Sequence, residues 1–250
     1  MLPLRDHLPT RRPPWVVYAL IVLNVLAFLW SRALMARGVD PSRFILGWGA
    51  VPARILADPA ANAITLLTST FLHDPTGFLH IGGNMLFLWI FGDNVEDAVG
   101  SARFIAFYLL CGLIAAIAQV AIDPHSHIPI IGASGAISGV LAAYASLYPR
   151  APITVLNPIP LLWLLWGLFL RLPAWLVILE YFAVNLFNGL TSVGQTGGGV
   201  AFFAHIGGFI AGLFLIRLFM IGRATKGYDR WQHLVPPKHA RGPRGRGDWG

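Results

Sequence analysis

The sequence contains few charged residues. Asp, Glu, Lys and Arg make up 12% of its 250 residues, whereas roughly 25% is usual for a soluble globular domain. Hydrophobic residues make up 56%, and apolar runs fill most of the chain. This composition excludes an ordinary soluble protein and predicts one integral membrane domain.

Cysteine is almost absent. Cys111 is the single cysteine and lies inside an apolar run, which excludes a disulfide framework and a cysteine-based zinc site. His125 and His127 form the spacing of a metal-binding pair, but the sequence offers no third ligand near them. We therefore expect neither a metal nor another cofactor.

The positive charge, formally +7, is concentrated at the two ends of the chain. Arg5, Arg11 and Arg12 precede the first apolar run, and a series of basic residues begins at Arg217 and continues into the C-terminal tail. Basic residues that flank apolar spans stay on the cytoplasmic side. This placement predicts cytoplasmic termini and a lipid bilayer as partner, and it argues against nucleic acid.

Six apolar runs alternate with more polar segments, at about 15–34, 78–92, 104–122, 132–148, 152–190 and 200–221. The fifth run exceeds the roughly 20 residues of one span and is interrupted at 171–173. It holds either two spans or one span after an interfacial piece. Two spans would place the basic C-terminal tail outside the cell, against the tendency of basic residues to stay in the cytoplasm. Three prolines also disfavour a helix over 152–160, so one span is the better interpretation.

We therefore predict an all-α membrane protein with six transmembrane helices, in which 173–190 is the fifth span and 152–171 is a connection at the cytoplasmic face. Residues 1–14 form a cytoplasmic N-terminal segment, 15–221 the membrane domain, and 222–250 a basic tail rich in Gly and Pro. Such a composition predicts disorder for the tail. The long outer connection at 35–77 has mixed composition and is expected to be a structured loop.

Polar residues lie near the starts of the second, fourth and sixth spans, which all run inward from the outer face. They are His80, Asn84, Ser134 and His205. With a rise of 1.5 Å per residue, these side chains share one shallow layer. Polar groups in a bilayer are costly unless they meet one another or water, so we expect these four to converge.

Small residues recur every four positions in the fourth and sixth spans, at Gly135, Gly139 and Ala143 and at Ala204, Gly208 and Gly212. Such spacing lets two helices pack closely in lipid. Close packing would bring the Ser134 hydroxyl within reach of the His205 imidazole, which could then remove its proton.

Three segments carry a family resemblance: Gly132-Ala133-Ser134-Gly135, Ala204-His205-Ile206-Gly207-Gly208, and Phe71-Leu72-His73 followed by His80-Ile81-Gly82-Gly83-Asn84-Met85. These segments follow one another along the chain in the order typical of the family, and over about residues 15–221 the chain resembles the rhomboid intramembrane serine proteases. The resemblance implies an endopeptidase that cleaves membrane proteins in or near their transmembrane segments. It also implies a multi-pass protein of a cell membrane, which we expect to be a bacterial cytoplasmic membrane.

The resemblance also implies roles for individual residues. Ser134 would be the nucleophile of a Ser–His dyad that forms an acyl-enzyme, and His205 would be the base and then the acid. His80, the Asn84 side chain and the Ser134 backbone N–H would stabilise the oxyanion. Gly132 and Gly135 suit a backbone that bends around the nucleophile.

The sequence departs from the family pattern one turn after the nucleophile, where Ser138 replaces an aromatic residue that many members pack against the base. The support of His205 must therefore differ. No acidic residue is suitably placed to complete a triad, since Glu180 lies too deep in the fifth span.

Two other functions are compatible with parts of the sequence. A catalytically silent rhomboid-like binding protein is disfavoured because both Ser134 and His205 are present. A transporter with His205 and Glu180 as a proton relay is disfavoured because no inverted repeat is evident.

Overall fold

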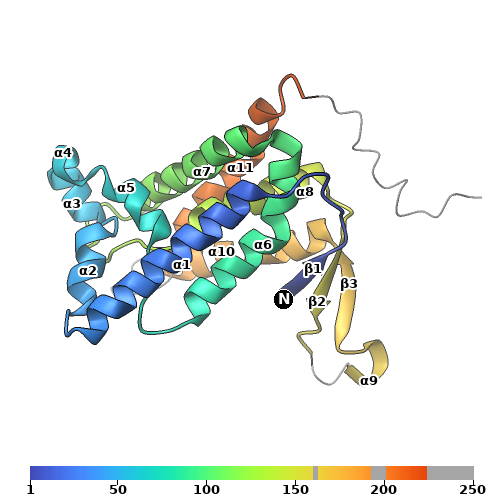
Figure 1. Cartoon of the computed structure of the whole chain (residues 1–250), viewed down its shortest axis with the longest axis horizontal. Helices are drawn as coiled ribbons and strands as arrows, with labels where there is room; N and C mark the ends of the chain where they lie inside the picture. The colour runs from blue at the N-terminus through green and yellow to red at the C-terminus, as the bar shows by residue number, and fades with distance from the viewer. Residues whose placement is uncertain (160–162, 193–200, 224–250) are drawn as a thin grey trace, which may run out of the picture.

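Six long helices dominate the fold, seen in a computed structural model that describes residues 1–159, 163–192 and 201–223 (Figure 1). The helices are α1 (Trp15–Ala36), α6 (Leu79–Val99), α7 (Ser101–Ile122), α8 (Ser134–Leu147), α10 (Ala174–Ser192) and α11 (Phe202–Phe219). Each lies on one of the apolar runs identified in the sequence, but α6 extends beyond the run 78–92 and α10 covers only the second half of the run 152–190. The basic tail and most of the Gly-rich loop before α11 lie outside the described residues.

Four of these helices, α1, α7, α10 and α11, are long and apolar enough to cross a membrane. Helix α8 is apolar but has 14 residues, and α6 carries polar residues near both of its ends. The chain is therefore a mostly helical multi-pass membrane protein. The count of six spans and the cytoplasmic position of the termini stay predictions.

Helix α8 forms the centre of the bundle and packs against α6, α7, α10 and α11. Every residue from 135 to 144 is buried. A Cβ atom on Gly208 would overlap the Gly135 carbonyl, and one on Gly212 would overlap the Gly139 carbonyl. This confirms the prediction that small residues bring the fourth and sixth spans into backbone contact.

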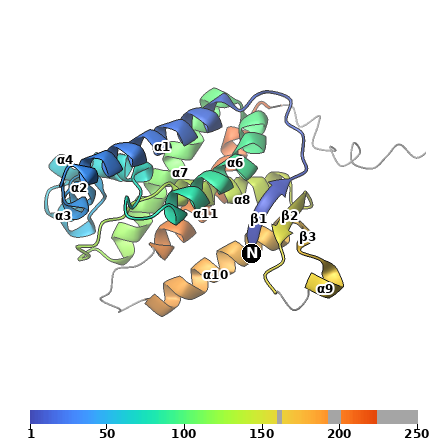
Figure 2. The same cartoon turned by 60° about the horizontal axis from the view of Figure 1, so that its bottom comes forward.

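The long connection after α1 folds into short helices: α2 (Pro41–Trp48), α3 (Pro52–Ala57), α4 (Pro59–Asn62), α5 (Thr65–Thr68) and the 3₁₀ turn η1 (Ser69–Phe71). Proline occupies the first position of α2, α3 and α4, where its missing N–H costs nothing. The connection is thus a structured loop, as expected. Figures 1 and 2 show α2–α4 at one end of the bundle, beyond the C-terminal end of α1.

A small antiparallel sheet lies at the opposite end of the bundle (Figures 1 and 2). Its strands are β1 (Leu2–Asp6), β2 (Pro152–Leu156) and β3 (Phe169–Pro173), in the order β1-β2-β3, and α9 (Trp163–Trp166) lies between β2 and β3 in the sequence. The prediction of an all-α chain is therefore wrong for this part. Proline disfavours a helix here but is compatible with strand ends, and the alternating Ile153 and Val155 are buried.

The N-terminus of α1 is fixed at this sheet end by a carboxylate from another helix. Glu96 of α6 accepts hydrogen bonds from the backbone N–H groups of Val16 and Val17, at 3.1 and 2.9 Å, and from the Ser101 hydroxyl at 2.6 Å. A negative charge at a helix N-terminus satisfies otherwise unpaired donors. Glu96 thereby ties α1 to the junction of α6 and α7.

Candidate active site

A cavity of about 690 Å³ lies where α6, α8 and α11 begin. Its lining includes the four polar residues that the sequence placed in one layer: His80, Asn84, Ser134 and His205. Most of the remaining lining is apolar or glycine. The structure therefore brings all four predicted side chains to one cavity.

Ser134 is the first residue of α8, so its side chain lies at the N-terminal end of the helix. The His205 ring reaches it from α11, with His205 Nε2 at 2.7 Å from Ser134 Oγ. His205 is buried, with 9% of its surface exposed. This is the distance at which an imidazole removes a hydroxyl proton.

Gly132 lies two residues before Ser134, at the point where His80 and Asn84 approach the loop. Its φ of 115° is rarely adopted by residues with a side chain. A Cβ here would also lie 2.8 Å from His80 Nε2 and 3.6 Å from Asn84 Nδ2. Glycine is therefore required for both backbone conformation and space, and two nitrogen atoms point at the loop that carries the nucleophile.

His73, in the connection before α6, holds the Asn84 side chain. Asn84 Nδ2 lies 2.9 Å from His73 Nε2, and because an amide nitrogen can only donate, His73 accepts. Burial, with a smaller contribution from His80, lowers the pKa of His73 to about 3. His73 is thus neutral and able to orient Asn84.

Helix α10 supplies two side chains to the His205 ring that lie outside the sequence motifs. Asn185 Oδ1 is hydrogen-bonded to His205 Nδ1, and the Tyr181 ring lies beside the imidazole, with centroids 6.3 Å apart and planes inclined by 35°. The polarity of Asn185 within an apolar span was the available signal. Tyr181 precedes it by one helical turn, on the same face.

Tyr181 also accounts for the unusual Ser138. The Tyr181 hydroxyl lies 2.7 Å from Ser138 Oγ, and Ser138 Oγ donates to the Ser134 carbonyl oxygen at 2.8 Å. The small side chain of Ser138 leaves space for an aromatic ring from α10. The prediction that His205 has a different support is confirmed: the ring beside it comes from another helix.

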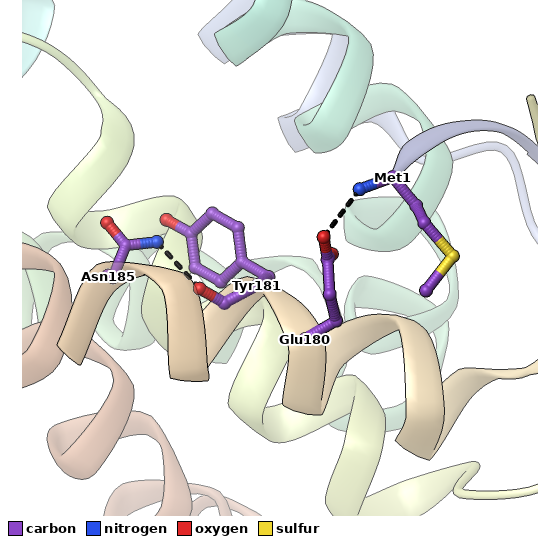
Figure 3. Close-up of polar contacts among 4 residues, drawn as sticks. All are labelled: Met1, Glu180, Tyr181 and Asn185. Carbon is purple, nitrogen blue, oxygen red and sulfur yellow. Dashed lines mark hydrogen bonds and ion pairs between the residues drawn. The ribbon is translucent and has the colours of Figure 1, made fainter. Parts of the chain in front are cut away.

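Glu180 does not take part in this arrangement. Its carboxylate forms an ion pair with the Met1 amino group at 2.7 Å (Figure 3). Among the described residues, the hydrogen-bond partners of the His205 ring are Ser134 and Asn185, and neither is acidic. No group of three or more metal-ligating side chains is brought together within the described ranges.

The fold and this site define a helical membrane protein with a serine and a histidine in hydrogen-bond contact. The family model described as "Rhomboid domain" matches residues 60–221. The chain belongs to the rhomboid family, whose members are typically intramembrane proteases.

Several known proteins are similar to this chain. Rhomboid protein 1, mitochondrial, of Saccharomyces cerevisiae is 29% identical over 180 residues, covering 68% of this chain and 48% of that protein. Rhomboid protease GluP of Bacillus subtilis is 34% identical over 139 residues, covering 55% and 26%. The human presenilin-associated rhomboid-like protein, mitochondrial, is 32% identical over 146 residues, covering 56% and 35%.

The aligned part of this chain spans less than half the length of each of these relatives. Two of the three are named as mitochondrial, and one comes from a bacterium. These relatives support a multi-pass membrane protein. They do not support a bacterial cytoplasmic membrane in particular.

Proposed function

We propose that this chain is a serine endopeptidase that hydrolyses peptide bonds in or near the transmembrane segments of membrane proteins. The observation that carries the proposal is the 2.7 Å contact between Ser134 Oγ and His205 Nε2, at the start of α8 and on the wall of a cavity. Both members of the pair are present and in contact. This geometry argues against a catalytically silent relative.

The reaction begins when Ser134 Oγ attacks the scissile carbonyl carbon while His205 Nε2 takes the hydroxyl proton. The tetrahedral intermediate collapses as the imidazolium gives this proton to the leaving amine, and the acyl group stays on Ser134. Water then enters the cavity, loses a proton to His205 and attacks the ester carbon. Breakdown of this second intermediate releases the acid and returns the proton to Ser134.

The oxyanion of each intermediate is stabilised by three donors: the Ser134 backbone N–H, Asn84 Nδ2 and His80 Nε2. The approach of both side-chain nitrogens to Gly132 supports this assignment. Asn84 Nδ2 carries two hydrogens, and one of them serves the contact with His73. The second hydrogen is available for the substrate oxygen.

The membrane arrangement proposed here has six spans within residues 15–221 and both termini in the cytoplasm. Support comes from the placement of the elements: β1 and the N-terminus lie at the end of the bundle opposite the short helices of the outer loop (Figures 1 and 2). The cavity lies at the starts of α6, α8 and α11, at the outer end. Water and substrate therefore reach Ser134 from the outer side.

The direct test is cleavage by the purified protein in liposomes. A fluorescent transmembrane peptide should be cut by the wild type, and Ser134→Ala and His205→Ala should each lower the rate by at least about 10⁴-fold, because the nucleophile and its base act as a unit. Cleavage that persists in Ser134→Ala would overturn the proposed mechanism. Chelator sensitivity would indicate a metal-dependent reaction instead.

A further inference from the structure

The proposed dyad requires one particular tautomer of the His205 ring, and the contact with Ser134 does not select that tautomer. His205 Nε2 faces Ser134 Oγ, so this nitrogen must be unprotonated to act as a base, and the ring hydrogen must be on Nδ1. Neutral histidine in water favours the opposite tautomer, with hydrogen on Nε2. A group on the far side of the ring is therefore needed to select the reactive form.

The orientation of the Asn185 amide selects this tautomer. Asn185 Nδ2 donates to the Tyr181 carbonyl oxygen of its own helix at 2.8 Å (Figure 3). That bond fixes which way the amide faces, because an amide nitrogen is a donor and a carbonyl oxygen accepts. Oδ1 is consequently the atom that faces His205 Nδ1, at 2.5 Å.

An amide oxygen can accept a hydrogen bond but has no hydrogen to give. The contact is therefore satisfied only if His205 Nδ1 carries the hydrogen, which leaves the lone pair of Nε2 directed at Ser134. Asn185 and His205 are 8% and 9% exposed. Little water competes for this hydrogen bond, and breaking it would leave two buried polar atoms unpaired.

We propose that Asn185 is the positioning residue of this active site, holding His205 in the tautomer with hydrogen on Nδ1 and fixing the direction of its ring. The inference rests on the proposed protease function. The Asn185 amide oxygen orients the histidine as the aspartate does in a Ser-His-Asp triad, but it places no charge among buried groups.

The neighbouring Tyr181 restricts the ring from the side. It packs next to the imidazole and is itself tied to α8 through Ser138. Both side chains come from α10, so the alignment of a base on α11 with a nucleophile on α8 depends on how α10 is docked. Displacement of α10 from the bundle would release His205 even with Ser134 and His205 intact.

The kinetic test compares three variants by separate measurement of kcat and KM with the transmembrane peptide. Asn185→Leu should lower kcat on the order of 100-fold and leave KM within about twofold, because the lost contact acts on the base and not on the substrate. Asn185→Asp keeps an acceptor opposite Nδ1 and should recover at least about tenfold relative to Asn185→Leu. Asn188→Leu makes the same change one turn along α10 and should retain wild-type kcat.

The second measurement needs no folded variant at position 185. Nitrogen-15 NMR of the wild type with labelled histidine, assigned by difference from His205→Gln, reports which ring nitrogen of His205 carries hydrogen at a pH where the protein is active. Hydrogen on Nδ1 alone is expected. Hydrogen on Nε2 alone would overturn the role of Asn185, whereas hydrogen on both nitrogens at an active pH would contradict His205 as the base.

The outcomes separate this inference from the proposed function. Full kcat in Asn185→Leu with an active, Ser134-dependent wild type would refute the positioning role and leave the protease intact. Equal losses in Asn185→Leu and Asn185→Asp, with hydrogen on Nε2, would assign Asn185 to packing alone. A wild type that neither cleaves nor reacts at Ser134 would instead reject the proposed function.

Discussion

Two side-chain nitrogens, His80 Nε2 and Asn84 Nδ2, lie 2.8 and 3.6 Å from the position that a Cβ on Gly132 would occupy. Their proposed role in oxyanion binding predicts a specific kinetic defect. His80→Ala and Asn84→Ala should each lower kcat by about 10²–10³-fold with little change in KM, because the donors act on charge that develops in the transition state. Steady-state cleavage of the transmembrane peptide measures this.

The control for this prediction is His125→Ala, which removes an exposed imidazole from the loop between α7 and α8. It should retain the wild-type kcat. A large rise in KM with unchanged kcat in His80→Ala or Asn84→Ala would assign the two residues to substrate binding instead.

Among the individual residues of the site, the sequence predicted those that lie in recognisable motifs, namely Ser134, His205, His80 and Asn84. It did not identify Asn185, because its contact with His205 depends on how α10 rotates and docks in the bundle. Spacing along one helix does not determine that rotation. The available hint was a buried polar residue in an apolar span, which membrane helices also use for simple packing.

At the scale of helices and strands, the close contact of α8 with α11 depends on glycine residues that have no Cβ atom. Gly208→Ala should lower the free energy of unfolding by about 1–3 kcal/mol, because the new Cβ overlaps the Gly135 carbonyl in a close-packed interface. The same change should slow the reaction of Ser134, since it pushes His205 away from α8. Thermal unfolding in detergent and the rate of Ser134 labelling measure the two effects.

Gly82→Ala is the matched control, because a Cβ at this position of α6 meets no atom within 4 Å. Alanine is a better helix former than glycine, by about 1 kcal/mol in exposed helix interiors. The control should therefore be at least as stable as the wild type. Equal stability of Gly208→Ala and Gly82→Ala would contradict the close contact of α8 with α11.

The long helices could be predicted from the apolar runs in the sequence, whereas the sheet could not. Each strand has five residues, and β1 pairs with β2 across 154 positions where Leu2 lies opposite Leu156. So short a pattern carries little periodic signal. Prolines correctly argued against a helix at 152–160, but they do not reveal a strand partner at the N-terminus.

At the scale of the whole molecule, Asp6 at the end of β1 connects the small sheet to the helix bundle. Its Oδ2 accepts hydrogen bonds from Asn94 of α6 at 2.8 Å and from the Tyr144 hydroxyl of α8 at 3.0 Å. Burial raises the pKa of Asp6 to about 6, against the opposing effect of the Tyr144 hydrogen bond. The folded protein therefore keeps the Asp6 proton at pH values where the unfolded chain has lost it.

This difference predicts how stability depends on pH. Between about pH 4 and pH 6 the folded state binds the extra proton, so the contribution of Asp6 to the free energy of unfolding falls as the pH rises. Asp6→Asn removes this titration and keeps an acceptor oxygen. The variant should gain on the order of 1–3 kcal/mol relative to the wild type between pH 4 and pH 7.

Thermal unfolding of both proteins at the two pH values measures this gain. A difference between variant and wild type that is the same at pH 4 and pH 7 would show that Asp6 is not held protonated by the fold.

The central claim is that Ser134 is a nucleophile activated by His205, and it is tested most directly by reaction with a fluorophosphonate followed by peptide mass spectrometry. We expect one adduct, on Ser134, that disappears in Ser134→Ala and forms at least about 10³-fold more slowly in His205→Ala, because the base must remove the hydroxyl proton. A folded wild type with no adduct on Ser134, or equal labelling in His205→Ala, would contradict the account.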